Sequence, residues 1–421
     1  MNADILIIGA GAAGLMAARE LGRAGKKVLV LEARDRIGGR ILPLNESDFG
    51  YPAQGGAEWV HGDAPVTKTL IKEAGLNLVL EQGELWSTRG GSLEQEGDFS
   101  DSDPALFEKL SELKEDVSIA DFLERNFGGD HYAHLRNSII KMAEGYDAAD
   151  PKLVSTFMIR DEWLDDSEWK DGRIKEGYTA LLNFLEVECK KYGVEFVFNT
   201  PAKKIELKNT DVTVNAAHKE FKASQVVVTV PLPLLKEIEF RPDITEKLEA
   251  VSDIGFGGVI KVLIKFKTRW WEHALPKDLT KMAFFICNEK YMTWWTQYPL
   301  INTVFTGWLA GPEAFKYAHA TNQELMDIAI DSLATTFKKS VGELKDEIVL
   351  SRVFNWPADP FTKGAYSYTT YKTGDAYKKV AAPIGNSIFF AGEALYSGDA
   401  TATVEGALGS GLETARKILK A

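Results

Sequence analysis

The chain has 421 residues, of which 45% are hydrophobic and 26% are charged, a composition typical of a folded globular protein with a large core. Its 61 acidic and 49 basic side chains give a formal net charge of −12, which argues against nucleic acid or an anionic membrane surface as a partner. The length suggests two domains, and the two cysteines, Cys189 and Cys287, suggest no disulfide framework and fit a reducing compartment.

The two ends of the sequence contain no recognisable targeting or anchoring segment. The first predicted strand begins at about residue 4, which leaves no room for a secretory signal peptide. The stretch 415–421 has no apolar run of about 20 residues. We therefore expect a cytoplasmic protein that does not bind a membrane.

The first forty residues contain the strongest motif of the chain. The apolar run Ile5–Ile8 predicts a buried strand, Leu15–Ala24 a helix, and Val28–Leu31 a second strand that ends at Glu32. Between the first strand and the helix stands a glycine-rich turn made of Gly9, Ala10, Gly11, Ala12, Ala13 and Gly14. This order of strand, glycine turn, helix, strand and acid is that of a dinucleotide-binding βαβ unit.

The chemistry of this unit explains its residue types. The glycines permit a tight turn, a close approach of the backbone to a pyrophosphate and close packing of the helix on the strand. The helix N-terminus offers free N–H groups to the phosphates, and Glu32 can accept hydrogen bonds from both ribose hydroxyls. A second glycine pair, Gly38 and Gly39, is followed by Arg40, which adds a cation beside the phosphates. An NAD-dependent enzyme has no need of this second turn.

The rest of the first half alternates between glycine-rich and helical stretches. A third glycine cluster covers 55–62, and a short helix is expected over 66–75. The polar stretch 81–103 is expected to be an exposed excursion, and 104–145 carries helical patterns. The stretch 161–169 is both acidic and aromatic. His131 and His134 are the only close histidine pair, and since no cysteine or acid pattern accompanies them we expect a solvated helix and no metal site.

The second half contains further strands of the same type, and its predicted elements can be given in chain order. They are a helix over 178–191, strands over 194–198, 204–207, 212–214 and 225–230, an alternating strand over 261–266, strands over 282–287 and 303–308, a helix over 322–337, a strand over 387–391 and a closing helix over 406–419.

The motifs together resemble the flavin-containing amine oxidases, a family that includes monoamine oxidases, polyamine oxidases, L-amino-acid oxidases and the histone demethylase of that fold. The resemblance rests on the glycine turn, on Glu32, and on the run from Glu32 to Arg40. It rests also on Phe389–Ala394, on 401–407, on Asn355–Ser367 and on Gly257–Val262, so that it covers almost the whole chain.

The resemblance implies a bound FAD and a set of residues that contact it. This set is Gly9, Gly11, Ala13, Gly14, Glu32, Ala33, Arg34, Gly38, Gly39, Arg40, Gly55, Gly56, Ala57, Glu58, Ala202, Trp356, Gly392, Glu393, Thr403 and Val404. The amide of Val404 is expected to face the flavin pyrimidine ring from a helix N-terminus, where it would stabilise negative charge on the reduced flavin.

The resemblance also implies catalytic residues at the flavin. Trp356 would pack at the flavin and Tyr366 would stand on the substrate side of the ring. Lys261 would hold a water that bridges to flavin N5. Thr403 takes the place of the second cage aromatic of monoamine oxidases, as in animal-type polyamine oxidases. Ala365 stands where monoamine oxidases carry the cysteine bonded to FAD, so we expect a non-covalent cofactor.

The same resemblance implies a two-domain α/β fold in which the chain alternates between domains. An FAD-binding, Rossmann-like domain of the GR2 type would comprise residues 1–80, 172–247 and 384–421. A substrate-binding domain with a mixed sheet and helices would comprise 81–171 and 248–383.

The expected function is oxidation of an amine to an imine and then an aldehyde, with dioxygen as acceptor and hydrogen peroxide as product. A polyamine is the favoured substrate because Glu58 and His61 lie in a stretch like the W-x-H-G motif of animal-type polyamine oxidases, with an added acid. An alternative makes Glu58 a surface or capping acid and His61 a packed imidazole. A monoamine oxidase, an L-amino-acid oxidase, a desaturase or protoporphyrinogen-type oxidase, and a non-catalytic flavoprotein are the other possibilities. The oligomeric state does not follow from the sequence.

Overall fold

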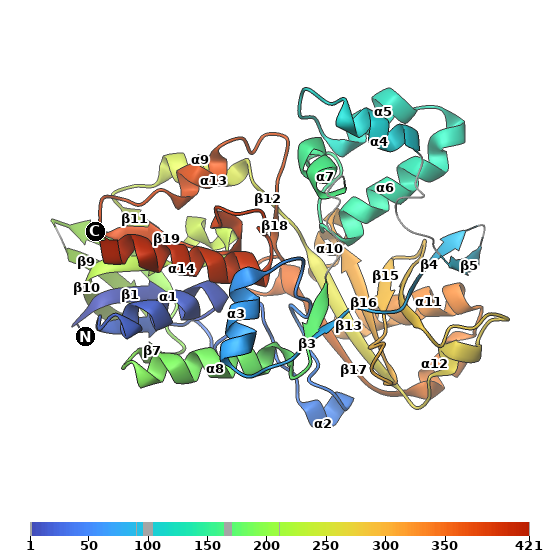
Figure 1. Cartoon of the computed structure of the whole chain (residues 1–421), viewed down its shortest axis with the longest axis horizontal. Helices are drawn as coiled ribbons and strands as arrows, with labels where there is room; N and C mark the ends of the chain where they lie inside the picture. Colours follow the sequence, from blue (N-terminus) through green and yellow to red (C-terminus); the bar gives the residue numbers. More distant parts are fainter. Residues whose placement is uncertain (1, 90, 96–103, 164–170, 210, 421) are drawn as a thin grey trace.

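The structure is a computed structural model that describes residues 2–89, 91–95, 104–163, 171–209 and 211–420. It contains two large β-sheets that lie side by side, each covered by helices, with a cluster of helices above the second sheet (Figure 1). This arrangement confirms the predicted α/β fold class.

The first sheet is built around parallel strands. Its order is β11-β8-β9-β10-β1-β2-β7, and β19 lies beside β10. The strands are β1 (Asn2–Ile8), β2 (Val28–Leu31), β7 (Glu195–Val197), β8 (Ala202–Lys208), β9 (Asp211–Ala216), β10 (Lys219–Val228), β11 (Glu239–Arg241) and β19 (Ile388–Phe390). The run β19-β10-β1-β2-β7 is parallel throughout, as expected of a nucleotide-binding sheet.

Strand β10 serves two parts of this sheet. Its first half pairs with β9 in an antiparallel hairpin, and its second half pairs with β19 in parallel. The sequence predicts a short strand at Phe221 and a separate strand over 225–230. The structure joins the two into one strand that begins at Lys219, because the hairpin with β9 continues directly into the parallel core.

Helices cover both faces of the first sheet. One face packs against α1 (Ala12–Arg23) and α14 (Val404–Lys420), which lie against each other (Figure 1). Two further helices pack beside them, α3 (Pro65–Glu73) and α8 (Gly177–Lys191). The other face shares a hydrophobic core with α9 (Thr245–Ser252) and α13 (Ala376–Ala381). Side chains of β8, β9 and β10 also contribute to this core.

The second sheet is mixed. Its order is β17-β13-β16-β15-β14-β4-β5, antiparallel except for the pair β14–β4. The strands are β4 (Glu84–Arg89), β5 (Ser92–Gln95), β13 (Val259–Phe266), β14 (Met282–Ile286), β15 (Thr293–Trp295), β16 (Val304–Ala310) and β17 (Ile348–Asn355). Its core includes helix α11 (Asn322–Phe337), and α12 (Val341–Glu347) follows at the same side.

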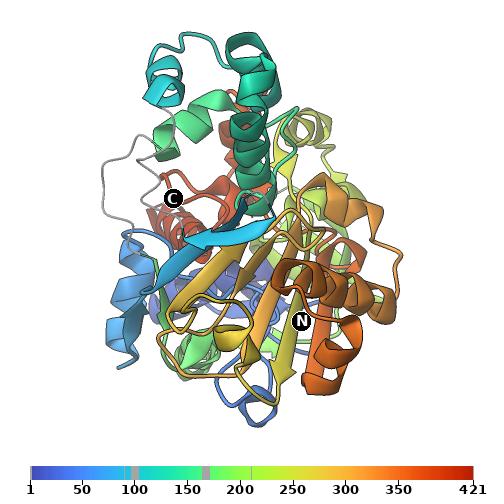
Figure 2. The same ribbon diagram turned by 90° about the vertical axis from the view of Figure 1, so that its right-hand side faces the viewer.

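A separate helical cluster stands above the second sheet (Figure 2). It is formed by α4 (Pro104–Ser111), α5 (Ile119–Phe127), α6 (Ala133–Gly145) and α7 (Thr156–Trp163), which share one hydrophobic core. The remaining helices are α2 (Glu46–Phe49), α10 (Pro312–Lys316) and the 3₁₀ turns η2 (Asp130–Tyr132), η3 (Leu232–Glu237), η4 (Trp270–His273), η5 (Trp356–Ala358) and η6 (Glu393–Leu395).

Two short strand pairs lie between the sheets. These are β3 (Leu78–Leu80) with β6 (Gly172–Ile174), and β12 (Gly255–Phe256) with β18 (Ser367–Tyr368). Both pairs join segments that are far apart in the sequence. The strands of the first sheet come from three separate stretches, and those of the second sheet from two. The two-domain boundaries themselves stay a prediction.

Two expectations about exposure are wrong. The polar stretch 81–103 is not simply an excursion, because β4 and β5 belong to the second sheet and bury Trp86 and Leu93 in its core. The strand around Lys261 does not alternate between core and solvent, because the second sheet is covered on both faces there and residues 259–264 are all buried. The stretch 164–170 lies outside the described residues. In the part of the chain that is described, no helix is long and apolar enough to cross a bilayer.

Candidate active site

The first glycine turn leads from β1 into α1 and leaves its backbone open. Gly9 has a φ of +107°, a conformation that favours glycine, and a Cβ on Gly14 would lie 2.0 Å from the carbonyl oxygen of Gly9. By contrast, a Cβ on Gly11, the N-cap of α1, would meet no atom within 4 Å. No side chain caps this helix, so its first N–H groups, in the turn that contains Gly11 and Ala13, lack a side-chain partner and suit an anion.

The end of β2 forms the second part of this site. The Glu32 carboxylate accepts hydrogen bonds from the backbone N–H of Ala10 at 2.7 Å and of Arg34 at 2.9 Å. The same stretch bonds to the segment that precedes Ala202, because the amides of Asn199 and Thr200 donate to the carbonyls of Arg34 and Glu32. Glu32, Ala33, Arg34 and the region of Ala202 therefore lie together in the fold.

The second glycine turn crosses over the first. Gly38 donates to the carbonyl of Ala10 at 2.8 Å, and a Cβ on Gly39 would lie 3.5 Å from Cα of Gly11. The Arg36 guanidinium holds this turn by donating to the carbonyls of Ile37, Gly39 and Ile41. Burial lowers the pKa of Arg36. Arg36 lies in the run from Glu32 to Arg40 that carries the resemblance, but it is not among the predicted FAD contacts.

Arg40 connects this turn with the C-terminal part of the chain. Its Nη1 donates to the carbonyl of Ala365 at 2.7 Å and to the Glu393 carboxylate at 2.8 Å. The other oxygen of Glu393 accepts from the Ser367 hydroxyl at 2.7 Å. Gly392, with a φ of +154°, precedes this acid, and a Cβ on it would meet no atom within 4 Å. Arg40, Gly392 and Glu393 are thus brought together.

These observations fit a bound FAD. Gly11, near the start of the chain, and Gly392, near its end, both have free space where a Cβ would lie. At Gly14, by contrast, a Cβ would clash with the carbonyl oxygen of Gly9. The uncapped N-terminus of α1 begins at Gly11, the buried Glu32 carboxylate bonds to the neighbouring amide of Ala10, and Arg40 bonds to Glu393 beside Gly392. The Arg34 guanidinium pairs with Asp359 at 2.6 Å and lies over the ring of Phe361, and its contact with FAD stays a prediction.

The start of α14 supplies a second helix N-terminus. Thr403 caps this helix, because its hydroxyl accepts from the amide of Gly406 at 3.0 Å and donates to the carbonyl of Ala400 at 2.7 Å. Val404 is the first helical residue, so its amide belongs to the positive end of the helix dipole. Glu405 fixes the start of α14 to α3 by accepting from the amides of Val66 and Thr67.

The third glycine cluster packs against the aromatic loop. Trp356 is buried and donates from Nε1 to the carbonyl of Gly55 at 3.2 Å. A Cβ on Gly56 would lie 1.8 Å from the carbonyl oxygen of Arg40 and 3.0 Å from the Trp356 ring. Ala57 donates to the same Arg40 carbonyl at 3.1 Å. The cluster therefore packs against both Arg40 and Trp356.

Lys261 is fully buried on β13 and points at this cluster. Its Nζ donates to the Glu58 carboxylate at 2.8 Å and to the carbonyl of Gly56 at 3.1 Å. Burial lowers the pKa of Lys261, and the Glu58 carboxylate opposes this effect. The ring of Trp295 lies 5.2 Å from the ammonium.

Glu58 has a second cationic partner that the sequence did not indicate. Nε of Arg173, on β6, lies 3.1 Å from the other Glu58 oxygen, and its guanidinium stacks 3.7 Å from the ring of Trp59. Trp295 Nε1 donates to both carboxylate oxygens at 3.3 Å. Although burial raises the pKa of Glu58, Lys261 and Arg173 outweigh it, and this pKa lies below its ordinary value.

His61 and Tyr366 are linked through Tyr146 and Asp171. His61 Nδ1 lies 2.6 Å from the Asp171 carboxylate, whose other oxygen accepts from the amide of Gly62. Tyr366 donates to the carbonyl of Tyr146 at 2.6 Å. The His61 and Tyr146 rings meet edge to face. Burial, Asp147 and Glu162 raise the pKa of Tyr366.

Three acids interact electrostatically with these side chains. Burial and the neighbouring Glu162 raise the pKa of Asp147 well above its ordinary value. Burial raises the pKa of Glu162 to about 7, against the opposing effect of His61, and Asp171 adds to the rise. Asp147, Glu162 and Asp171 are referred to below as the acid group.

The structure changes the interpretation of Glu58 and His61. Glu58 is not a surface or capping acid, since it is 7% exposed and paired with two cations. Its charge is therefore not free for a substrate, contrary to expectation. The His61 side chain is 34% exposed and bonded to Asp171, so it is not simply a packed imidazole. Glu162 belongs to the acidic and aromatic stretch 161–169 that the sequence marked. Arg173, Asp147 and Asp171 carried no local sequence signal, and only the tertiary fold brings them here.

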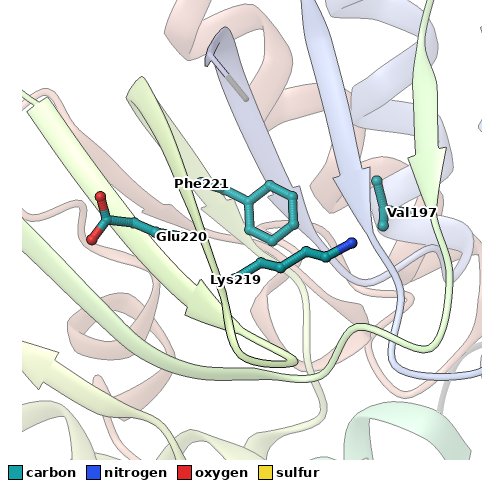
Figure 3. A pocket seen from close by; sticks show the side chains of 4 residues that line it. All are labelled: Val197, Lys219, Glu220 and Phe221. Atoms are coloured by element: carbon teal, nitrogen blue, oxygen red, sulfur yellow. The ribbon is translucent and has the colours of Figure 1, made fainter.

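A hollow in the surface lies elsewhere. Val197, Lys219, Glu220 and Phe221 line it, on β7 and the start of β10 (Figure 3). None of the predicted site residues lines this hollow. Within the described ranges, no group of three or more histidine, cysteine or acidic side chains could hold a metal ion.

Comparison with known proteins agrees with the expected family. Residues 12–419 match the flavin containing amine oxidoreductase family. Polyamine oxidase 3 of Oryza sativa subsp. japonica is 29% identical over 98% of this chain and 88% of that protein. Lysine-specific histone demethylase 1 homolog 3 of Arabidopsis thaliana is 26% identical over 99% of this chain, which spans only 30% of that relative.

Solved structures share the fold. A putrescine oxidase bound to putrescine superposes with a TM-score of 0.82 at 21% identity, with both chains covered completely. Cyclohexylamine oxidase from Brevibacterium oxydans IH-35A gives a TM-score of 0.80 at 20% identity, over 100% of this chain and 99% of that one. At these identities the likeness shows the fold.

Proposed function

The chain belongs to the flavin containing amine oxidoreductase family, and we propose that it is an FAD-dependent oxidase of an amine with a second cationic group. FAD is the cofactor typical of this family. When bound, it would accept a hydride equivalent from the amine carbon and pass the electrons to dioxygen. Two electrons and two protons leave the amine and convert dioxygen to hydrogen peroxide, and water then hydrolyses the imine to an aldehyde.

Each part of the chain has a separate task in this proposal. The glycine turns, Glu32 and Arg40 would hold the FAD. Trp356 and Tyr366 would shape the surface beside its ring and keep water away from the reacting carbon. Lys261 would hold a water near the flavin. The FAD would be non-covalent, because Ala365 cannot form a thioether bond.

The acid group carries the preference for a di- or polyamine. Asp147 and Glu162 both act electrostatically on Tyr366, and Asp171 and Glu162 act on Tyr146. Two of these acids have raised pKa values, so a nearby ammonium would stabilise their charged forms. A second cationic group of the substrate would bind there, while the reacting nitrogen must be neutral. Free alkyl amines titrate near ~10.4, so turnover is expected to rise with pH.

A substrate panel with peroxide detection tests the proposal. Spermine, spermidine, acetylated polyamines, putrescine, benzylamine and tyramine are compared in the wild type, Glu162→Gln, His61→Ala and Glu58→Gln. Asp161→Asn is the matched control, since Asp161 adjoins Glu162 but is exposed. We expect Glu162→Gln to lower kcat/KM for polyamines at least tenfold and to leave benzylamine unchanged. If benzylamine or tyramine is the best substrate and no variant penalises polyamines selectively, a monoamine oxidase is the correct description.

A further inference from the structure

We propose that Glu58 is a positioning residue that keeps Lys261 charged and aimed at the flavin, and that it does not bind the substrate. The inference rests on the proposed function, because it assumes that Lys261 acts beside a bound flavin. It replaces the role that the sequence suggested for Glu58. The resemblance that points to Lys261 says nothing of what compensates its charge.

The geometry leaves Glu58 no capacity for a substrate cation. One carboxylate oxygen lies 2.8 Å from Lys261 Nζ and the other 3.1 Å from Arg173 Nε. Trp295 donates to both oxygens, and Gln297 Nε2 lies 3.5 Å from one of them. All these contacts lie in the interior, so a substrate ammonium would have to displace a buried cation to reach the acid.

The same geometry fixes the direction of the lysine. An ammonium has three N–H groups, and Glu58 and the carbonyl of Gly56 take two of them. Gly56 packs against Arg40 and against Trp356, the residue that the resemblance places at the flavin. The third N–H is thus the one that can bind a water or a cofactor atom.

Glu58 also determines whether this lysine can stay charged. Burying an ammonium is costly unless an opposite charge lies close to it. The groups that face Lys261 are Glu58 from the glycine cluster and Arg173 from β6, with Tyr51 and Glu81 acting on Arg173. Without Glu58, two buried cations would face each other with no anion between them. Lys261 would then release its proton at a lower pH than in the wild type.

Reoxidation of the flavin by dioxygen measures this effect without any amine. Holoprotein is photoreduced, mixed with oxygenated buffer and followed by flavin absorbance between pH 6 and 10. We expect Glu58→Gln to react at least tenfold more slowly than wild type at pH 8 and to recover on acidification. Lys261→Met should be slow at every pH, and Glu58→Asp should resemble the wild type. Lys265→Met is the control, since Lys265 lies on the same strand and its Nζ donates to the carbonyl of Asp48.

Thermal unfolding of the holoprotein gives a second measurement that does not depend on activity. Glu58→Gln leaves Lys261 and Arg173 without a counter-charge, so removing the Lys261 charge as well should raise the unfolding temperature again. We expect the double variant Glu58→Gln/Lys261→Met to recover at least half of the loss in unfolding temperature caused by Glu58→Gln alone. If Glu58→Gln does not fold, recovery of folding in the double variant is the expected result.

Three results would overturn the inference. The first is a Glu58→Gln reoxidation rate that equals the wild type across the pH range. The second is a double variant that unfolds at the sum of the two single losses. The third is a Glu58→Gln variant whose only change is a raised KM for polyamines, which would restore Glu58 as a substrate ligand. The reoxidation and unfolding measurements use no amine, so failure of the proposed substrate class would not affect them.

Discussion

Single residues of the site illustrate what local sequence can and cannot indicate. The place of Lys261 in an apolar strand next to a glycine pair marks it as unusual, and the structure shows that it is fully buried. Its partners do not follow from the sequence, because Glu58 and Arg173 are 203 and 88 positions away along the chain and meet it only in the tertiary fold. The sequence suggested an unpaired Glu58 carboxylate for the same reason, because Lys261 and Arg173 are far from it along the chain.

Lys261→Met should leave FAD bound and slow either amine oxidation or flavin reoxidation at least tenfold. Tenfold corresponds to about 1.4 kcal/mol of barrier, which is modest for the loss of a positioned polar group. Stopped-flow measurement of the two half-reactions, together with the flavin spectrum, checks this. Wild-type rates in both half-reactions would mean that Lys261 only supports the fold.

Glu162 should make stability depend on pH near neutrality. Its pKa is about 7 in the folded protein against an ordinary value of 4.5, so the folded state binds its proton more tightly. The free energy of unfolding is then highest below pH 4.5 and falls as the pH rises through 7, by up to about 3 kcal/mol.

Glu162→Gln cannot titrate and should avoid this fall. Its unfolding temperature relative to wild type should therefore increase between pH 4.5 and pH 8. Asp161→Asn, at the exposed neighbouring position, should show no such trend. A constant difference between Glu162→Gln and wild type at all pH values would contradict the assignment.

At the scale of elements, the sequence predicts the parallel core well. The apolar runs of β1, β2 and β19 and the helices α1, α8 and α14 were all located by periodicity and glycine placement, because each is a local pattern. The β4–β5 hairpin was not predicted, because most of its residues are polar and only Trp86 and Leu93 pack inward. The small β3–β6 and β12–β18 pairs join distant segments, and pairing of this kind leaves no local trace.

The two glycines of the first turn should respond differently to the same substitution. Gly14→Ala places a Cβ 2.0 Å from the Gly9 carbonyl oxygen and should prevent correct packing of α1 on β1. Gly11→Ala meets no protein atom, and its φ of −74° suits alanine, so the protein should fold. The new methyl would stand in the space assigned to the pyrophosphate, and the affinity for FAD should fall at least tenfold.

Thermal unfolding and FAD titration of the two variants separate these effects. We expect Gly11→Ala to lose FAD affinity with an apoprotein as stable as wild type. We expect Gly14→Ala to lose stability even without FAD. Normal FAD affinity in Gly11→Ala would show that the pyrophosphate does not approach this glycine.

On the scale of the whole molecule, the cofactor site draws on segments from every part of the chain. Arg40 bonds to Ala365 and Glu393, and the glycine cluster at 55–58 touches β13 and Trp356. A ligand that binds across these contacts stabilises the folded state by mass action, with about 2.7 kcal/mol at a concentration of 100 Kd.

The purified protein should be yellow and should release all of its FAD on acid or heat denaturation. The reason is Ala365, which offers no sulfur for a covalent bond. Measuring flavin absorbance in the supernatant and in the precipitated protein checks this. Flavin that stays with the precipitate would contradict non-covalent binding, and a colourless protein that cannot be reconstituted would contradict the flavoenzyme assignment altogether.

The packing of α14 on α1 has a consequence for biosynthesis. A Cβ on Gly411 would lie 2.3 Å from the carbonyl oxygen of Ala13, so the helix that follows the first glycine turn is completed by a helix made after almost all of the other residues. Gly392, Glu393 and the amide of Val404 are also translated late. We therefore expect the flavin to be loaded only after residues 392–411 have been synthesised and have packed against the βαβ unit.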